Sequence, residues 1–166
     1  MKFIHCPYCG EKLDKKSIGD EGVVPYCNNC EMPIFDLMYT CILTLVINEF
    51  NEIALIRQEY ISKTNYVCVA GHIKPGEDAE NTVIREVKEE LGLDVVNARY
   101  IKSYYYEKKD MLMLGFVSKV KKDSFNISSE VDEAQWFSID EALVNLKDAS
   151  IAIKLLKDYL KEYNKE

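Results

Sequence analysis

The chain has 166 residues, of which 48% are hydrophobic and 30% are charged, and its formal net charge is −7. These values are typical of a soluble globular protein, and the length suits one compact domain with a small appendage. The negative charge argues against non-specific nucleic-acid binding, which needs a basic surface. It does not exclude a phosphate substrate, because bound metal ions reverse the local sign of a site.

The start of the chain lacks the apolar core of a signal peptide. The longest apolar stretch, residues 39–47, is too short to span a membrane. We therefore expect a cytoplasmic protein without a membrane partner. Thiols stay reduced in that compartment, so closely spaced cysteines indicate a metal site before a disulfide.

Two cysteine pairs mark the first part of the chain, Cys6-x-x-Cys9 and Cys27-x-x-Cys30. Four thiolates at this spacing can close a tetrahedral site, which leaves no open position for catalysis. The pattern resembles a zinc ribbon with structural Zn²⁺, and disulfides or a redox pair are the alternatives. The segment is loop-rich and needs a bound metal ion or a cross-link to fold. We expect a zinc ribbon over residues 1–36 and a second domain over residues 37–166.

The second part of the chain alternates strand and helix patterns. The predicted strands are Thr40–Ile47, Ile53–Arg57, Tyr66–Ala70, Val95–Tyr106, Met111–Val120 and Ala134–Phe137. Helical periodicity covers residues 79–91, where Val83, Ile84, Val87 and Leu91 are expected on the core side, and again residues 150–163. Ser138 and Glu141 form the pattern of a capping box. This order of elements predicts an α+β fold, an α/β/α sandwich with a mixed sheet.

The helix over residues 79–91 carries an unusual acidic stripe. Glu86, Glu89 and Glu90 are spaced i, i+3 and i+4, so they share one face although like charges repel there. Hard cations such as Mg²⁺ and Mn²⁺ prefer this set of oxygen ligands. A solvated acidic face is the alternative, and the loop before the helix argues against it. Gly71 and Gly76 bracket that tight loop.

The segment GHIKPGEDAENTVIREVKEELGL, residues 71–93, resembles the catalytic signature of the Nudix hydrolases. In that signature a glycine is followed after five residues by glutamate, and after seven more by Arg-Glu-aliphatic-x-Glu-Glu-x-Gly-aliphatic. This chain has its members at every fixed position: Gly71, Glu77, Arg85, Glu86, Val87, Glu89, Glu90, Gly92 and Leu93. The flanking strands also fit the sandwich of that family.

The resemblance implies a hydrolase that cleaves a nucleoside diphosphate linked to a group X into a nucleoside monophosphate and X-phosphate. It implies Mg²⁺ or Mn²⁺ bound by Glu86, Glu89 and Glu90, with one glutamate as a candidate base. Arg85 is expected to orient the glutamates, and Glu77 to support the loop or a further metal ion. Glu130, in a loop that returns a carboxylate to the metal in many Nudix enzymes, is the candidate for a fourth ligand; an ordinary loop charge is the alternative.

A zinc ribbon before this domain resembles the NADH pyrophosphatase branch, which includes enzymes that remove NAD caps from RNA. The branch implies a dinucleotide substrate, a capped RNA end as the one nucleic-acid partner, and a homodimer. Its Ser-Gln-Pro-Trp-Pro-Phe-Pro-x-Ser stretch is absent: residues 103–110 read SYYYEKKD and share only the serine. A nucleotide-sugar, ADP-ribose or nucleoside triphosphate pyrophosphatase therefore stays open, as does a non-catalytic nucleotide sensor.

Three residues outside the signature are candidates for substrate contact. Tyr104 and Tyr106 alternate on a strand and can stack on a nucleobase, with packing in the core or on the surface as the alternative. Arg57, at the end of its strand, can reach a phosphate or remain solvated. Cys41 and Cys68 lie in apolar strands and are expected to be buried without a chemical role.

Overall fold

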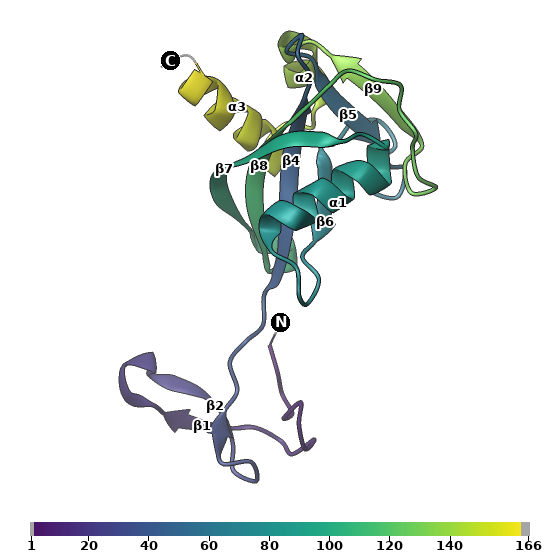
Figure 1. The fold of residues 1–166 in the computed structure, drawn as a ribbon. Coiled ribbons are helices and arrows are strands. Elements are labelled where there is room, and N and C mark those ends of the chain that lie inside the picture. Colours follow the sequence, from purple (N-terminus) through teal and green to yellow (C-terminus); the bar gives the residue numbers. More distant parts are fainter. Residues whose placement is uncertain (1, 164–166) are drawn as a thin grey trace. The chain divides into compact units, whose positions relative to one another are not determined.

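The computed structural model describes residues 2–163 and divides the chain into two compact units, Met1–Tyr39 and Thr40–Glu166. Each unit has its own buried cluster of side chains, and each is described separately. Figure 1 shows the fold of both, with the first in purple.

The first unit contains a small antiparallel sheet of three strands, β1 (Asp14–Ser17), β2 (Val23–Cys27) and β3 (Met32–Pro33), with a 3₁₀ turn at Gly19–Glu21. Its core consists of Cys6, Cys27 and Ile34, with Phe3, Leu13 and Cys30 packed around them. The sequence predicted loops here. All four residues of β1 are exposed, so the strand leaves no apolar alternation to detect.

The second unit is built on a sheet of six strands. The strands are β4 (Tyr39–Ile47), β5 (Ile53–Arg57), β6 (Val69–His72), β7 (Val95–Tyr106), β8 (Met111–Val120) and β9 (Glu133–Phe137). Their order is β7-β8-β4-β5-β9, and β6 pairs with β4. Three helices accompany the sheet: α1 (Ala79–Leu91), α2 (Ile139–Asn145) and α3 (Ile151–Tyr163).

The central strand β4 is buried on both faces, and its side chains alternate between two cores. Leu43 and Leu45 pack with α2 and α3, whereas Ile42 and Val46 pack with α1. The helices therefore cover opposite faces of the sheet, as Figure 1 shows. The predicted α+β sandwich is confirmed.

Most predicted strand bounds agree with the structure because alternation and turn residues mark them clearly. The third strand differs: it was predicted over Tyr66–Ala70, but β6 begins at Val69. Val67 forms an isolated bridge with Ile56 of β5, and Tyr66 a parallel bridge with Leu146. One apolar run thus contributes to three pairings, which period-two alternation cannot distinguish.

The expected core face of α1 needs one correction. Val83, Val87 and Leu91 are fully buried, but Ile84 is 44% exposed. Glu90 takes a place on the buried side. The helix packs through the i, i+4 and i+8 positions that begin at Val83, which turns Ile84 by about 100° towards solvent.

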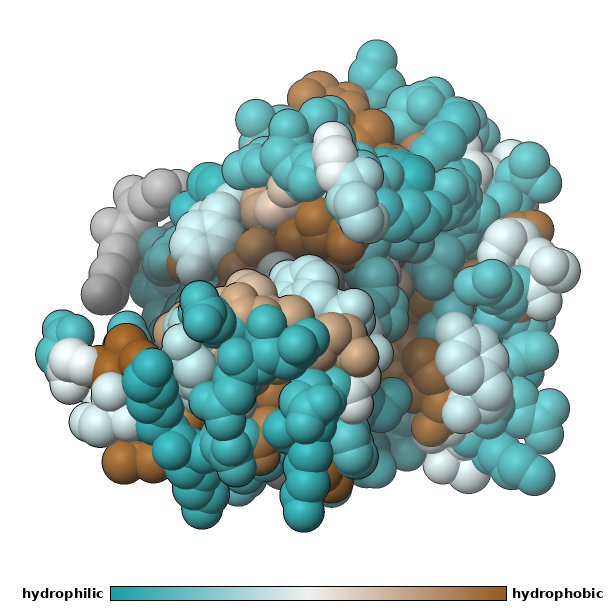
Figure 2. All heavy atoms as spheres, turned by 90° about the horizontal axis from the view of Figure 1, so that it is seen from below, coloured by the Kyte–Doolittle hydropathy of each residue, from teal (hydrophilic) through white to brown (hydrophobic). Residues whose placement is uncertain are grey.

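The surface of the described chain is mixed. On the face drawn in Figure 2, hydrophilic side chains predominate and hydrophobic ones form patches between them. Within residues 2–163, no helix has the length and apolar content that crossing a membrane requires.

Candidate metal-binding active site

The loop between β6 and α1 determines where the helix begins. Gly76 adopts a φ of +91°, a conformation that glycine reaches without strain. Asp78 then caps the helix, because its side chain accepts a hydrogen bond from the Asn81 amide at 2.8 Å. At the other end Gly92, with φ +74°, closes α1 through a hydrogen bond from its amide to the Lys88 carbonyl at 3.0 Å.

Arg85 lies at the centre of a network that joins the loop to the helix. Its Nε and Nη2 donate to the two carboxylate oxygens of Glu77 at 2.7 and 2.9 Å, a bidentate pair. Nη1 donates to Glu86 at 2.6 Å and to Glu89 at 3.0 Å, and Nη2 also reaches the His72 carbonyl at 3.1 Å. One guanidinium thus holds three carboxylates and the end of β6 in a fixed arrangement.

The charge of Arg85 acts strongly on Glu77. The hydrogen bonds from Arg85, followed by those from the Lys74 amide and Thr82, lower the pKa of Glu77 to about 2. Glu77 is therefore ionised at any ordinary pH. Its two oxygens are occupied by donors, so in this arrangement it braces the loop.

Glu90 has a different environment. The residue is only 5% exposed, and burial raises the pKa of its carboxyl to about 8, with the charges of Glu86, Glu130 and Glu89 adding to the effect. Its Oε1 accepts a hydrogen bond from Gln58 at 3.0 Å. Its Oε2 is the one buried side-chain oxygen or nitrogen without a partner among residues 2–163.

Burial also raises the pKa of Glu86, in spite of the hydrogen bond from Arg85. Neighbouring carboxylates that resist ionisation indicate a place where a cation is needed to offset their charge. The donor set consists of carboxylate oxygens, which suit Mg²⁺ or Mn²⁺ better than softer ions. Glu86, Glu89 and Glu90 therefore offer the donor chemistry that a divalent cation prefers, with Arg85 on one oxygen of Glu86 and one of Glu89 in the present arrangement.

Glu130 lies in the loop before β9, within electrostatic reach of the acidic helix. Its charge contributes to the raised pKa of both Glu90 and Tyr60. The loop is anchored near Glu130, because the Asp132 amide donates to the Arg57 carbonyl at 2.9 Å and Asp132 accepts from the Glu59 amide at 2.6 Å. Glu130 therefore lies close enough to Glu90 for the two charges to interact.

The other candidates for substrate contact lie elsewhere. Tyr104 is buried in the core beneath α3, on the sheet face opposite α1, and its hydroxyl donates to Asp158 at 3.0 Å. Tyr106 packs at the edge of that same core. Arg57 is paired with Glu133 at 2.6 Å. None of the three is brought into the carboxylate cluster, whereas Gln58, which the sequence analysis overlooked, contacts it directly.

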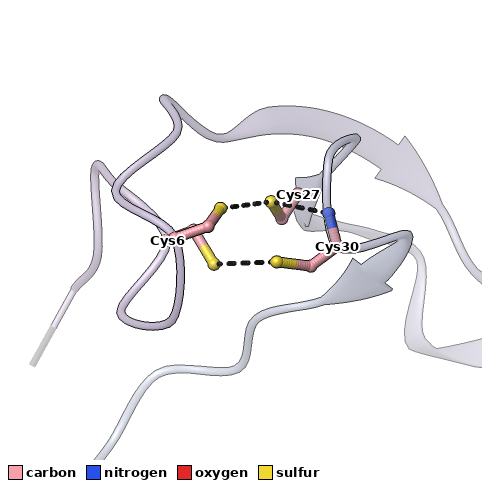
Figure 3. Close-up of side chains that lie close together, drawn as sticks. Cys6, Cys27 and Cys30 are labelled. Atoms are coloured by element: carbon pink, nitrogen blue, oxygen red, sulfur yellow. Dashed lines mark hydrogen bonds between the residues drawn. The ribbon is translucent and has the colours of Figure 1, made fainter.

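The four cysteines of the first unit form a separate cluster, drawn in Figure 3. Their sulfur atoms lie within 4.8 Å of one another, with Cys6 and Cys30 at 3.9 Å and Cys9 and Cys27 at 3.5 Å. A disulfide requires about 2.05 Å, whereas tetrahedral zinc with bonds of about 2.3 Å places sulfurs about 3.8 Å apart. The cluster therefore fits a Zn²⁺ ion.

The thiols of this cluster also influence one another's pKa. Hydrogen bonds from the Glu11 backbone and from Asn29 lower the pKa of Cys9 to about 6. A hydrogen bond with the Cys9 side chain, together with burial, raises the pKa of Cys30 to about 12. Four sulfurs this close cannot all ionise unless a cation offsets their charge.

A sequence profile described as the NUDIX domain matches residues 40–159 of the chain. The chain belongs to the NUDIX family. The resemblance of residues 71–93 to the family signature is thereby confirmed, and the matched range covers the six-stranded sheet and α1.

Curated relatives extend the similarity to the first unit. The NAD-capped RNA hydrolase NudC of Pseudomonas aeruginosa is 31% identical over 94% of this chain and 56% of its own length. The enzyme of the same name from Vibrio atlanticus is 29% identical over 99% of this chain and 60% of its own length. This NUDIX chain thus spans a little over half the length of these relatives.

Solved structures show the same fold. A NUDIX hydrolase from Nitrosomonas europaea matches 98% of this chain and 93% of its own, with a TM-score of 0.78 and 19% identity. The NUDIX domain of Shewanella oneidensis NrtR, solved with ADP ribose, matches 83% of this chain with a TM-score of 0.66 and 11% identity.

Proposed function

We propose that this NUDIX protein is a metal-dependent pyrophosphohydrolase that cleaves a nucleoside diphosphate linked to X into a nucleoside monophosphate and X-phosphate. The observation that carries the proposal is the arrangement around Glu90. A carboxylate oxygen without a partner is buried beside two further glutamates of one helix, and Arg85 fixes their geometry. A buried charge of this kind is costly in a structural helix and useful in a metal site.

In this mechanism Glu86, Glu89 and Glu90 would hold Mg²⁺ or Mn²⁺, and Glu130 is the candidate for a further ligand. When bound, such an ion would supply positive charge to offset the pyrophosphate oxygens and would lower the pKa of a water molecule. In the hydrolysis a water oxygen forms a new bond to phosphorus, the bridging P–O bond breaks with X-phosphate or the nucleoside monophosphate as the leaving group, and the water proton passes to a base. Arg85 keeps the glutamates in place during the step, and one of them is the candidate base.

The preferred substrate class is an NAD-like dinucleotide, free or at the end of an RNA. The support is the cysteine cluster together with NudC relatives, named as NAD-capped RNA hydrolases, that match both units of the chain. The negative net charge agrees with recognition of an RNA end rather than of its phosphate backbone.

A second candidate is a pyrophosphatase for ADP-ribose, nucleotide sugars or nucleoside triphosphates. The segment at the end of β7 and in the turn that follows favours it, because residues 103–110 replace the proline-rich stretch of the NADH pyrophosphatase branch. Tyr104 of that segment is buried under α3, so it is not placed to stack on a base.

A substrate panel tests the proposal. The purified full chain is incubated with Mg²⁺ or Mn²⁺ and NADH, NAD, NAD-capped RNA, ADP-ribose, dinucleoside polyphosphates or nucleotide sugars, and products are separated by chromatography. We expect a nucleoside monophosphate from at least one of them, and turnover reduced by orders of magnitude in Glu89→Gln and Glu90→Gln. If no compound is cleaved while the wild type still binds metal, a nucleotide-sensing role replaces the enzymatic one.

A further inference from the structure

Gln58 is a buried polar residue that the family signature does not contain. It follows Arg57 at the end of β5 and is 3% exposed. Its carbonyl oxygen accepts hydrogen bonds from the amides of Ile61 and Ser62, both at 2.9 Å, so its main chain is fixed by the turn that follows β5. Its side-chain amide crosses to α1 and donates to Glu90 at 3.0 Å.

The glutamates of the family signature are thus held by two different donors. Arg85 binds Glu77, Glu86 and Glu89, and Glu90 receives its hydrogen bond from Gln58, which directly follows β5. An amide donor orients a carboxylate without neutralising its charge.

The hydrogen bond engages only one oxygen of Glu90. Oε1 accepts from Gln58, whereas Oε2 is buried without a partner. A buried oxygen without a hydrogen bond costs free energy, about 1–3 kcal/mol. Binding of a cation at Oε2 removes that cost.

We propose that Gln58 is a positioning residue that holds Glu90 so that its second carboxylate oxygen binds the catalytic divalent ion. This inference rests on the proposed function, because it presupposes a divalent ion at the glutamates of the family signature. Partners that orient metal ligands contribute about 10–100-fold to metal affinity or activity.

Metal binding provides the main test. Mn²⁺ affinity of the zinc-loaded full chain is measured by electron paramagnetic resonance for the wild type and Gln58→Met, which keeps the side-chain volume and removes the donor. We expect the dissociation constant to rise about 10–100-fold. Gln135→Met is the matched control, because Gln135 is exposed on β9, and it should stay within about twofold of wild type.

A double-mutant cycle separates positioning from a merely structural role. In the Glu90→Gln background the effect of Gln58→Met on Mn²⁺ affinity should shrink to about twofold or less, because the residue acts through Glu90. With saturating metal, Gln58→Met should lower kcat and leave KM for the nucleotide nearly unchanged. If Gln58→Met does not fold, Gln58→Asn, which withdraws the amide by one methylene, is measured and should show the same loss.

Mn²⁺ affinity within about twofold of wild type in the folded Gln58 variants would overturn the inference. An undiminished effect in the Glu90→Gln background would also overturn it. The proposed function fails in a different way: the wild type binds Mn²⁺ more tightly than Gln58→Met but hydrolyses no nucleotide. Circular dichroism and thermal unfolding establish that each variant compared is folded.

Discussion

Gly71 of β6 lies directly against the carboxylate of Glu86 on α1. A Cβ atom added at Gly71 would overlap Oε1, Cδ and Cγ of Glu86. The backbone of Gly71 itself is ordinary, because its φ lies outside the positive region. The first glycine of the signature is therefore required by the close approach of a strand to a metal-ligand candidate, and not by a turn.

Gly71→Ala is expected to displace Glu86 and disturb the site. We expect Mn²⁺ affinity and turnover to fall about 10–100-fold, with a loss of about 1–3 kcal/mol in the free energy of unfolding. Gly115→Ala is the matched control, because a Cβ there meets Tyr104 and Leu155 instead. The Gly115 variant should lower stability and leave Mn²⁺ affinity unchanged. If the Gly71 and Gly115 variants bound Mn²⁺ equally well, Gly71 would have no specific role beside Glu86.

Arg85→Lys tests whether one guanidinium sets the geometry of three carboxylates. Lysine keeps the positive charge but cannot make the bidentate pair with Glu77 while also reaching Glu86 and Glu89. We expect kcat to fall about 10–100-fold, measured by steady-state kinetics at saturating metal. Arg99→Lys, on an exposed pair with Glu162, is the control. A lysine variant with wild-type kcat would show that charge alone is sufficient.

The raised pKa of Glu90 predicts that the free energy of unfolding depends on pH when no Mg²⁺ or Mn²⁺ is added. Its folded-state pKa of about 8 lies above the ordinary 4.5, so the folded state binds the proton more tightly than the unfolded state does. Its contribution is therefore complete below about pH 4.5 and is lost as pH rises through about 8. Chemical denaturation across this range should show the decline.

Glu90→Gln should remove that decline, because glutamine carries no ionisable group. At about pH 9 we expect the variant to be more stable than wild type by about 1–3 kcal/mol. Added Mn²⁺ should stabilise the wild type and have much less effect on the variant. Parallel pH profiles for the two proteins would show that Glu90 does not titrate in this way.

Removal of zinc is expected to affect the first unit selectively. Its core cluster consists of three buried residues with three more packed around them, so without the metal little apolar surface remains to hold the unit together. Hydrogen exchange after chelation should show lost protection in residues 2–39 and retained protection in β4 and β5. Colorimetric release of one zinc ion per chain provides the stoichiometry. Equal loss in both units would contradict the separation of their cores.

Tyr104→Phe distinguishes packing from substrate contact. The hydroxyl of Tyr104 bonds Asp158, which also pairs with Lys161 at 3.0 Å, so its removal should cost about 1 kcal/mol of stability. Because the ring lies on the face opposite α1, KM for the nucleotide should not change. A raised KM in this variant would place the tyrosine in the substrate site.

The sequence by itself determined the parts of this protein that depend on local spacing. The distances between Glu86, Glu89 and Glu90 along a helix follow from its period, and the long strands follow from alternation bounded by turn residues. The two cysteine pairs were likewise visible as a metal-ligand pattern. For the same reason the family signature can be read from residues 71–93 alone.

Only the tertiary structure decided which of these side chains meet. Glu90 is buried and Ile84 is exposed because α1 packs against the sheet through Val83 and Val87, which helical period alone does not fix. The contact between Gln58 and Glu90 joins residues 32 positions apart, and no local rule connects them. Strand alternation made Tyr104 a candidate for stacking on a nucleobase, but it did not determine which face of the sheet the side chain is on. Packing against α3 places Tyr104 in the core.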